Sequence, residues 1–212
     1  MNPTVIDLYC KAGGSSKGFH DAGFDVVGVD IEPQPRYPYE FHQGDAIEFI
    51  LKYGKDFDLV YGGPPCQSYS EMTNATGTQD NHPRLVSATR AAMRSTGKPY
   101  VIENVPGAPL QNPITLCGSM FNLRVRRHRL FECDPVIWWP PSACNHTLKA
   151  PRSGRAPTEE QFYSVVGHFS DVSGARRAME IDWMTRDELS QAIPPAYTEW
   201  LGRQIIKRVL IK

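Results

Sequence analysis

The stretch Val5-Ile6-Asp7-Leu8-Tyr9-Cys10-Lys11-Ala12-Gly13-Gly14-Ser15-Ser16 joins an apolar strand pattern to a glycine loop. Residues 5–9 predict a buried β-strand, and a helix is expected from the serines to about residue 22. The two glycines between them let the backbone come close to a ligand at the start of the helix. A strand, a glycine loop and a helix in this order are typical of nucleotide-binding α/β folds.

The same alternation continues along the chain. Strands are expected at 25–30, 58–61 and 99–104, and helices at 46–53 and 86–95. Alternating strands and helices imply right-handed crossovers. We therefore predict an α/β fold with a doubly wound, mostly parallel sheet, similar to the Rossmann fold.

Acidic residues follow the glycine loop at the ends of predicted segments. Asp30 ends the second strand about 20 residues after the loop, where an acid can accept hydrogen bonds from ribose hydroxyls. Asp45 either serves the same ligand or caps the next helix, or does both. Together with Gly13 and Gly14, these acids predict a cofactor that contains a nucleoside.

A rigid loop follows the strand at 58–61, in the sequence Gly62-Gly63-Pro64-Pro65-Cys66-Gln67-Ser68-Tyr69-Ser70. The two prolines fix φ and remove two backbone donors, so the loop that carries Cys66 has few conformations. A thiol held at the carboxyl edge of a sheet is placed for nucleophilic attack. The alternative is a buried structural cysteine after a turn.

Composition narrows the class of protein. The chain has 212 residues with 41% hydrophobic content, enough for one domain or one domain with a small appendage. Its apolar stretches are too short to span a membrane, and residues 1–4 lack the pattern of a signal peptide. Five irregularly spaced cysteines argue for reduced thiols. We expect a cytoplasmic protein with no membrane partner.

The charges balance overall but are unevenly spread. Residues 1–60 hold ten acids and five bases, whereas residues 122–157 hold seven bases and two acids. Ordinary solvated surface explains scattered charges, but it explains the dense cluster at 124–129 poorly. An acidic first part and a basic later part suit a protein that binds a neutral or cationic cofactor in one region and phosphates in another.

Four motifs in order resemble the DNA (cytosine-5) methyltransferase family. They are Asp7-Leu8-Tyr9-Cys10-Lys11-Ala12-Gly13-Gly14, Gly62-Gly63-Pro64-Pro65-Cys66-Gln67-Ser68, Glu103-Asn104-Val105 and Arg127-His128-Arg129. The match covers residues 5–133 well and the C-terminal helix moderately. Size and layout are similar to the solitary enzymes of bacteriophages and prophages.

The resemblance implies a role for each catalytic candidate. Cys66 would add to C6 of cytosine and so make C5 nucleophilic, which requires a lowered thiol pKa or a nearby base. Glu103 would hold N3 in its protonated form, helped by burial that raises its pKa. Arg129 would hold the cytosine carbonyl oxygen, and Arg127 would contact a backbone phosphate.

The resemblance also implies a cofactor and a partner. The cofactor would be S-adenosylmethionine, and the partner double-stranded DNA with the target base flipped out. The residues expected at the cofactor are Tyr9, Lys11, Ala12, Gly13, Gly14, Asp30, Ile31, Asp45, Ala46, Gly63, Pro65, Gln191 and Ala192. Those expected at DNA are Gln67, Ser68, Ser70, Arg124, Arg126, Arg152 and Arg155.

Several positions depart from the family pattern. Lys11 replaces a glycine beside the expected methionine end of the cofactor, Val125 replaces a glutamine before the arginines, and Gln191 stands where asparagine is usual. Lys11 is expected to point outward or to pair with an anion. The sharper hypothesis is that it accepts carboxy-S-adenosylmethionine, which would give 5-carboxymethylcytosine.

Length is the largest departure. We divide the chain into a catalytic and cofactor-binding core (1–133), a reduced target recognition region (134–178) and C-terminal helices that pack back on the core (179–212). The recognition region is long enough for a hairpin and loops but not for a second core. Specificity is therefore expected to be short or helped by dimerisation, in a monomer or weak dimer. The pair Trp138-Trp139 is interpreted as packing.

We assign no metal site from the sequence. Cys133, Cys144 and His146 are possible zinc ligands, but the Cys-x-His spacing is not a standard pairing and a fourth ligand is not evident.

The C-terminal segment predicts two helices. Thr185 begins a capping box, and Pro195 suits the first turn of the last helix.

Two other functions stay open. An inactive DNA-binding relative is disfavoured because Cys66, Glu103, Arg127 and Arg129 occur together. An RNA cytosine methyltransferase is disfavoured by Gln67, which follows Pro-Pro-Cys as in the DNA enzymes. The target sequence and any companion enzyme of a restriction-modification system are not encoded in these motifs.

Overall fold

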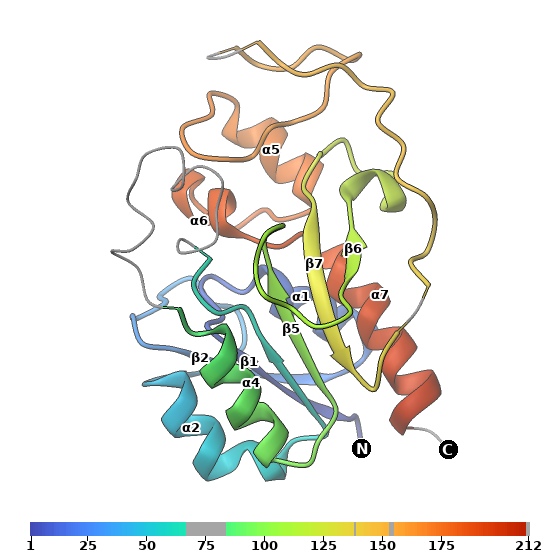
Figure 1. The fold of residues 1–212 in the computed structure, drawn as a ribbon. Helices are drawn as coiled ribbons and strands as arrows, with labels where there is room; N and C mark the ends of the chain where they lie inside the picture. Colours follow the sequence, from blue (N-terminus) through green and yellow to red (C-terminus); the bar gives the residue numbers. More distant parts are fainter. Residues whose placement is uncertain (67–83, 138, 153–154, 211–212) are drawn as a thin grey trace.

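A seven-stranded mixed sheet forms the centre of the computed structural model, which describes residues 1–66, 84–137, 139–152 and 155–210 (Figure 1). The strand order is β3-β2-β1-β4-β5-β7-β6. The parallel strands are β1 (Thr4–Leu8), β2 (Asp25–Asp30), β3 (Glu40–Gln43), β4 (Leu59–Gly62) and β5 (Tyr100–Asn104), and β7 (Arg129–Asp134) runs antiparallel between β5 and β6 (Ile114–Leu116). The predicted doubly wound, mostly parallel sheet is confirmed.

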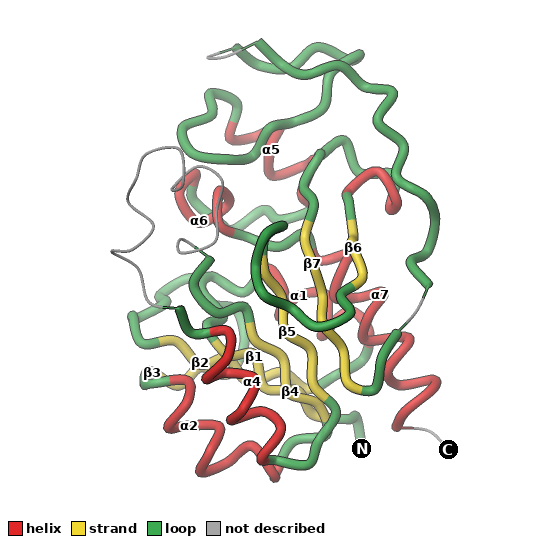
Figure 2. The backbone as a smooth tube through the Cα atoms, viewed as in Figure 1, coloured by secondary structure: helices red, strands yellow, loops and turns green. Residues whose placement is uncertain are grey.

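Helices cover both faces of this sheet, as the views in Figures 1 and 2 show. One face packs on α1 (Gly14–Ala22) and α7 (Pro195–Ile205), with Phe19 and Tyr197 fully buried. The other face packs on α2 (Ala46–Tyr53) and α4 (Val86–Ser95), with Ile50 and Met93 fully buried. The predicted bounds of β2, α2 and α4 agree with the structure.

The close packing of α1 on α7 depends on small residues. A Cβ on Gly18 would overlap the carbonyl oxygen of Pro195 and the hydroxyl of Thr198. The Thr198 hydroxyl donates to the carbonyl oxygen of Ser15 over 2.8 Å. Because Ser15 lies in the first turn of α1, the last long helix supports the segment that follows the glycine loop.

The C-terminal predictions hold in detail. Thr185 and Glu188 form a reciprocal capping box at the start of α6 (Arg186–Gln191), and Pro195 is the first residue of α7. Short helical turns complete the chain: η1 (Gly54–Asp56), η3 (Gly118–Phe121) and η4 (Ile206–Leu210).

The recognition region differs from its prediction. Between β7 and the helix α5 (Val172–Met179), the described residues form loops with isolated bridges rather than a hairpin (Figure 2). The helix was not predicted; Asp171 caps it by accepting from the backbone N–H of Gly174. The packing interpretation is wrong for Trp139, whose exposed fraction is 71%, and Trp138 lies outside the described residues.

Among the helices that the structure describes, none combines the length and the apolar character needed to cross a membrane.

Candidate active site

Cys66 lies just beyond the carboxyl end of β4, in the centre of the sheet. The backbone N–H of Gly63 donates to the carbonyl oxygen of Leu8, and the Asn104 amide donates to the carbonyl oxygen of Pro64 over 2.9 Å. The two strands beside β4 therefore hold the start of the loop, just before Cys66. The thiol of Cys66 is half-buried at the resulting edge.

Glu103 and Arg129 meet beside this loop. Glu103 is in β5 and Arg129 begins β7, which pairs antiparallel with β5. Arg129 Nε lies 3.0 Å from Glu103 Oε1, and Arg129 Nη1 donates to the carbonyl oxygen of His128. Glu103 Oε1 nevertheless has no hydrogen-bond partner of good geometry. A buried carboxyl with unused hydrogen-bonding capacity is suited to holding a substrate.

Burial sets the protonation of the two reactive side chains. It raises the pKa of Glu103, while the charges of Arg129 and Arg127 oppose the rise. Burial also raises the pKa of the Cys66 thiol, and the charge of Glu103 raises it further. Of the two alternatives expected for Cys66, a lowered thiol pKa is not found in this structure, because desolvation outweighs the two arginines, and a nearby base stays a prediction.

Arg127 is buried rather than displayed to solvent. Its guanidinium donates to the carbonyl oxygens of Val165 and Ser190, each over 2.8 Å. Burial and the neighbouring Arg129 lower the pKa of Arg127 to about 9. The expected phosphate contact stays a prediction; in this structure Arg127 fastens the recognition region and the C-terminal segment to the start of β7.

A pocket of about 250 Å³, here called the central pocket, joins these groups to the glycine loop. Cys66, Glu103, Arg127 and Arg129 all line it. Among the expected cofactor residues, the pocket is lined by Tyr9, Lys11, Ala12, Gly14, Asp30, Ile31, Gly63, Pro65, Gln191 and Ala192. The residues predicted for catalysis and most of those predicted for the cofactor therefore line one cavity.

The family model for C-5 cytosine-specific DNA methylases matches residues 3–113, more than half of the chain. The chain belongs to this family.

Relatives and solved structures agree with this assignment. The type II methyltransferase M.XorII of Xanthomonas oryzae pv. oryzae is 37% identical over 122 residues, which cover 50% of this chain and 28% of that protein. M.AquIA of Picosynechococcus sp. is 33% identical over 165 residues, covering 63% of this chain and 66% of that protein. The chain thus spans between about a quarter and two thirds of these relatives.

Two solved structures are similar in fold over nearly the whole chain. One is described as a DNA modification methyltransferase encoded within a prophage (E. coli), with a TM-score of 0.61, 16% identity and coverage of 97% of this chain and 99% of that one. The other is the S. pombe Dnmt2 methyltransferase, with a TM-score of 0.61, 12% identity and coverage of 98% and 99%.

The remaining cofactor candidates of this methylase family member lie near the central pocket without lining it. Gly13 caps α1 with a left-handed φ of 85° and faces the Tyr37 ring. Asp45 caps α2, where its Oδ1 accepts from the backbone N–H of Ile47 and Glu48. The helix-cap alternative for Asp45 is confirmed, and Ala46 is the buried first residue of that helix.

Lys11 has a definite set of partners. Its backbone takes a left-handed φ of 47°, and its N–H donates to Asp30 Oδ2. Its ammonium lies 3.1 Å from the Glu32 carboxylate and 3.7 Å from that of Asp30. The carboxylates that Lys11 meets in this structure belong to the protein, at the rim of the central pocket, and its expected pairing with the methionine carboxylate or a DNA phosphate stays a prediction.

Sequence reasoning missed several residues that line or support the central pocket. Trp183 Nε1 donates to the carbonyl oxygen of Ala12 over 2.9 Å, and Arg36 forms an ion pair with Glu188. The sequence signal for Trp183 was its residue type alone, an aromatic ring with a polar N–H that finds a partner when it packs. The carbonyl oxygen of Ser190, which accepts from Arg127, had no signal because every residue has a carbonyl group.

The expected DNA contacts fall into three groups. Gln67, Ser68 and Ser70 lie outside the described residues. Arg124 donates to the carbonyl oxygens of Thr158 and Gln161, so it supports the recognition region from the segment that precedes β7. Arg126, Arg152 and Arg155 are exposed.

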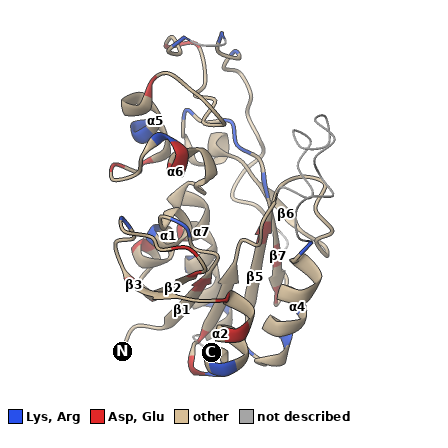
Figure 3. Ribbon diagram, turned by 90° about the vertical axis from the view of Figure 1, so that its left-hand side faces the viewer, with Lys and Arg blue, Asp and Glu red and all other residues tan. Residues whose placement is uncertain are grey.

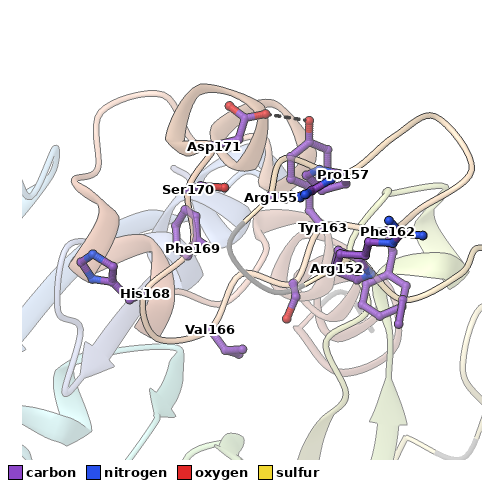
Figure 4. Close-up of a pocket in the computed structure, with 13 residues that line it drawn as sticks. Arg152, Arg155, Pro157, Phe162, Tyr163, Val166, His168, Phe169, Ser170 and Asp171 are labelled. Carbon is purple, nitrogen blue, oxygen red and sulfur yellow. Dashed lines mark hydrogen bonds between the residues drawn. The ribbon is translucent and has the colours of Figure 1, made fainter.

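A second cavity of about 350 Å³, here called the outer pocket, lies wholly in the recognition region (Figure 4). Arg152 and Arg155 line it together with Phe162 and Tyr163, and Tyr163 donates to Asp171 over 3.0 Å. Basic side chains beside aromatic rings suit contact with phosphates and bases.

Proposed function

We propose that the protein is a DNA cytosine-5 methyltransferase that acts through a covalent bond between Cys66 and C6 of cytosine. The observation that carries the proposal is the meeting of Cys66, Glu103 and Arg129 in one pocket with the glycine loop. A nucleophile, a proton donor and a cation around one cavity are what addition to a cytosine ring requires.

The residues divide the chemistry as follows. The Cys66 sulfur, as thiolate, bonds to C6, and the electron pair moves toward N3, where protonated Glu103 holds the developing charge. Arg129 holds the cytosine carbonyl oxygen and its own partner Glu103 in place. S-adenosylmethionine supplies an electrophilic methyl group to C5. Loss of the C5 proton and elimination of the sulfur then restore the aromatic ring and the free thiolate.

The central pocket fits a nucleoside-containing donor. Asp30 sits at its wall with each carboxylate oxygen accepting one backbone N–H, from Lys11 and Glu32, so each oxygen keeps a further lone pair for a ribose hydroxyl. Tyr9 and the exposed side chain of Ile31 offer apolar surface for the adenine.

The identity of the donor depends on Lys11. Its charge is already balanced by Glu32 and Asp30, which supports S-adenosylmethionine over the carboxylated donor. Its position at the pocket supports keeping carboxy-S-adenosylmethionine as the alternative. Mass spectrometry of nucleosides after incubation of DNA with each donor distinguishes 5-methylcytosine from 5-carboxymethylcytosine, and RNA of the same sequence tests the substrate class.

The central test is Cys66→Ala. We expect the variant to give no modified cytosine and no covalent adduct with DNA containing 5-fluorocytosine, while the unchanged protein gives both. The variant should still bind S-adenosylmethionine by calorimetry, because the thiol is one of many groups in the pocket. Modified cytosine from the alanine variant would refute the covalent mechanism, and an inactive unchanged protein would favour the DNA-binding relative.

A further inference from the structure

Four side chains with metal-binding chemistry converge outside the central pocket: Cys117, His128, Cys144 and His146. Their ligand atoms all lie within 4.8 Å of one another. Cys117 follows β6, His128 directly precedes β7, and Cys144 and His146 lie in the loop after β7. Three segments that are well separated along the chain therefore bring two sulfurs and two imidazoles together, which is a ligand set of structural zinc sites.

The distances match tetrahedral coordination. Cys117 Sγ lies 3.5 Å from His146 Nε2, and Cys144 Sγ lies 3.4 Å from His128 Nε2. Zinc bonds of about 2.3 Å to sulfur and about 2.0–2.1 Å to nitrogen give a sulfur–nitrogen edge of roughly 3.5 Å in a tetrahedron. Two edges of the expected tetrahedron are thus already formed, and both histidines present the same ring nitrogen, Nε2.

The surroundings suit a bound cation. The Ser119 hydroxyl donates to Cys117 Sγ and accepts from the backbone N–H of Asn145, so one side chain links the positions of the two cysteines. Donors of this kind orient a thiolate toward a metal. Cys117 is buried while Cys144 and His146 are exposed, which leaves a path from solvent to the site.

The position of the cluster indicates what a bound ion would do. His128 lies between Arg127 and Arg129, and the loop that carries Cys144 and His146 is the beginning of the recognition region. This loop lacks regular secondary structure in its described part, and a short segment without a core of its own needs another source of stability. A metal would join it to the strand that carries the catalytic arginine.

We propose that Cys117, His128, Cys144 and His146 bind one zinc ion, which fastens the start of the recognition region to β7. Four protein ligands complete the coordination of the ion, so its role is structural and not catalytic. The sequence pointed to Cys144 and His146 but paired them with Cys133, which is buried in β7 opposite Val101 and outside the cluster. The true partners were hidden because Cys117 and His128 meet the loop through the β6–β7 pairing.

Metal content tests the site without any assay of methyl transfer. Protein from zinc-supplemented cells, kept reduced and passed over a desalting column, is expected to hold about one zinc per chain by mass spectrometry. Cys144→Ser and His146→Ala should lower that content at least about tenfold. Both residues are exposed, so circular dichroism should show an intact fold. The matched control His168→Ala, an exposed histidine of the same region, should keep its zinc.

Cobalt gives a second readout on the unchanged protein. Replacing zinc with Co²⁺ should produce sulfur-to-cobalt absorption in the near ultraviolet and visible bands of a tetrahedral ion. A chain that takes up neither metal, or variants that keep zinc as well as the control does, would overturn the proposal. Chelation should also speed cleavage by trypsin after Lys149, and an unchanged rate would refute the fastening role.

Discussion

At the scale of single residues, burial decides the chemistry of the site. The thiol of Cys66 and the carboxyl of Glu103 both have raised pKa values because both are withdrawn from water. For Glu103 this favours the protonated form that the reaction needs. For Cys66 the raised pKa disfavours the thiolate, so the sulfur stays protonated until a change in its surroundings lowers that pKa. Neutralising Glu103 is one such change, because its negative charge is the second cause of the raised thiol pKa.

This coupling predicts the pH dependence of Cys66. Because its pKa is raised, alkylation of Cys66 by iodoacetamide should rise with pH over a higher range than alkylation of a free cysteine peptide measured alongside. Glu103→Gln removes the carboxylate charge and should move the alkylation profile to lower pH. Peptide mass spectrometry follows the Cys66 peptide itself, and Cys66→Ala supplies the background. A midpoint in the unchanged protein at or below that of the free cysteine peptide would contradict the burial argument.

The residues that sequence reasoning placed well are those whose role depends on a strand end. Cys66, Glu103 and Asp30 follow from where β4, β5 and β2 stop, since parallel strands deliver their ends to one edge. Arg127 lines the central pocket as its place in the motif predicts, but its burial could not be foreseen. Its partners, Val165 and Ser190, lie 38 and 63 residues further along the chain.

At the scale of elements, hydrophobic periodicity predicted the regular part of the fold and failed where periodicity is weak. Residues 25–30 and 46–53 carry clear patterns and took the predicted form. The helix α5 is short and buries Ala175, Ala178 and Met179, which are weak signals beside Gly174 in its first turn. The antiparallel β6 has three residues, too few for a pattern. The local sequence therefore predicts the strands and helices of the core but not the short elements at its edge.

The junction of β1 with α1 carries a prediction for stability. Asp7 in β1 is fully buried and accepts from the hydroxyls of Ser15 and Ser16 at the start of α1, but its Oδ1 has no partner. Burial raises the pKa of Asp7 from 3.8 to about 7. The folded state therefore holds the proton more tightly than the unfolded chain. The contribution of the Asp7 proton to the free energy of unfolding is therefore fully present below pH 3.8 and is lost as the pH rises to about 7.

Asp7→Asn should remove this dependence. A pKa difference of one corresponds to about 1.4 kcal/mol, so the loss between pH 4 and pH 8 is on the order of a few kcal/mol in the unchanged protein. Urea unfolding across this range should show a flatter profile for Asp7→Asn. Asp21→Asn, which removes a more accessible carboxylate from α1, is the control. Equal pH profiles for Asp7→Asn and the unchanged protein would mean that Asp7 does not titrate in this range.

At the scale of the whole molecule, the central pocket lies between two unlike ends. Helix α2 and the 3-10 turn after it lie at one end, and α5 with the loops of the recognition region lies at the other (Figure 1). Lysines and arginines are found on the segments around α5 and on the chain leading to it (Figure 3). The exposed Arg152 and Arg155 belong to this second end, and the exposed Arg126 lies against it with its guanidinium over the Phe162 ring. Under the proposed function, this is the end at which we expect DNA to bind.

Removing positive charge from each end in turn tests which end contacts DNA. Each phosphate contact that is lost should reduce the slope of log K against log salt by about 0.9. The double variant Arg152→Ala and Arg155→Ala should therefore reduce the magnitude of this slope by roughly 1–2. The double variant Lys52→Ala and Lys55→Ala removes the same charge from exposed positions at the far end and should leave the slope unchanged. Fluorescence anisotropy with a short duplex measures both slopes. Equal slopes for the two double variants would place the DNA surface away from the outer pocket, because a phosphate contact has to appear in the salt dependence wherever it is made.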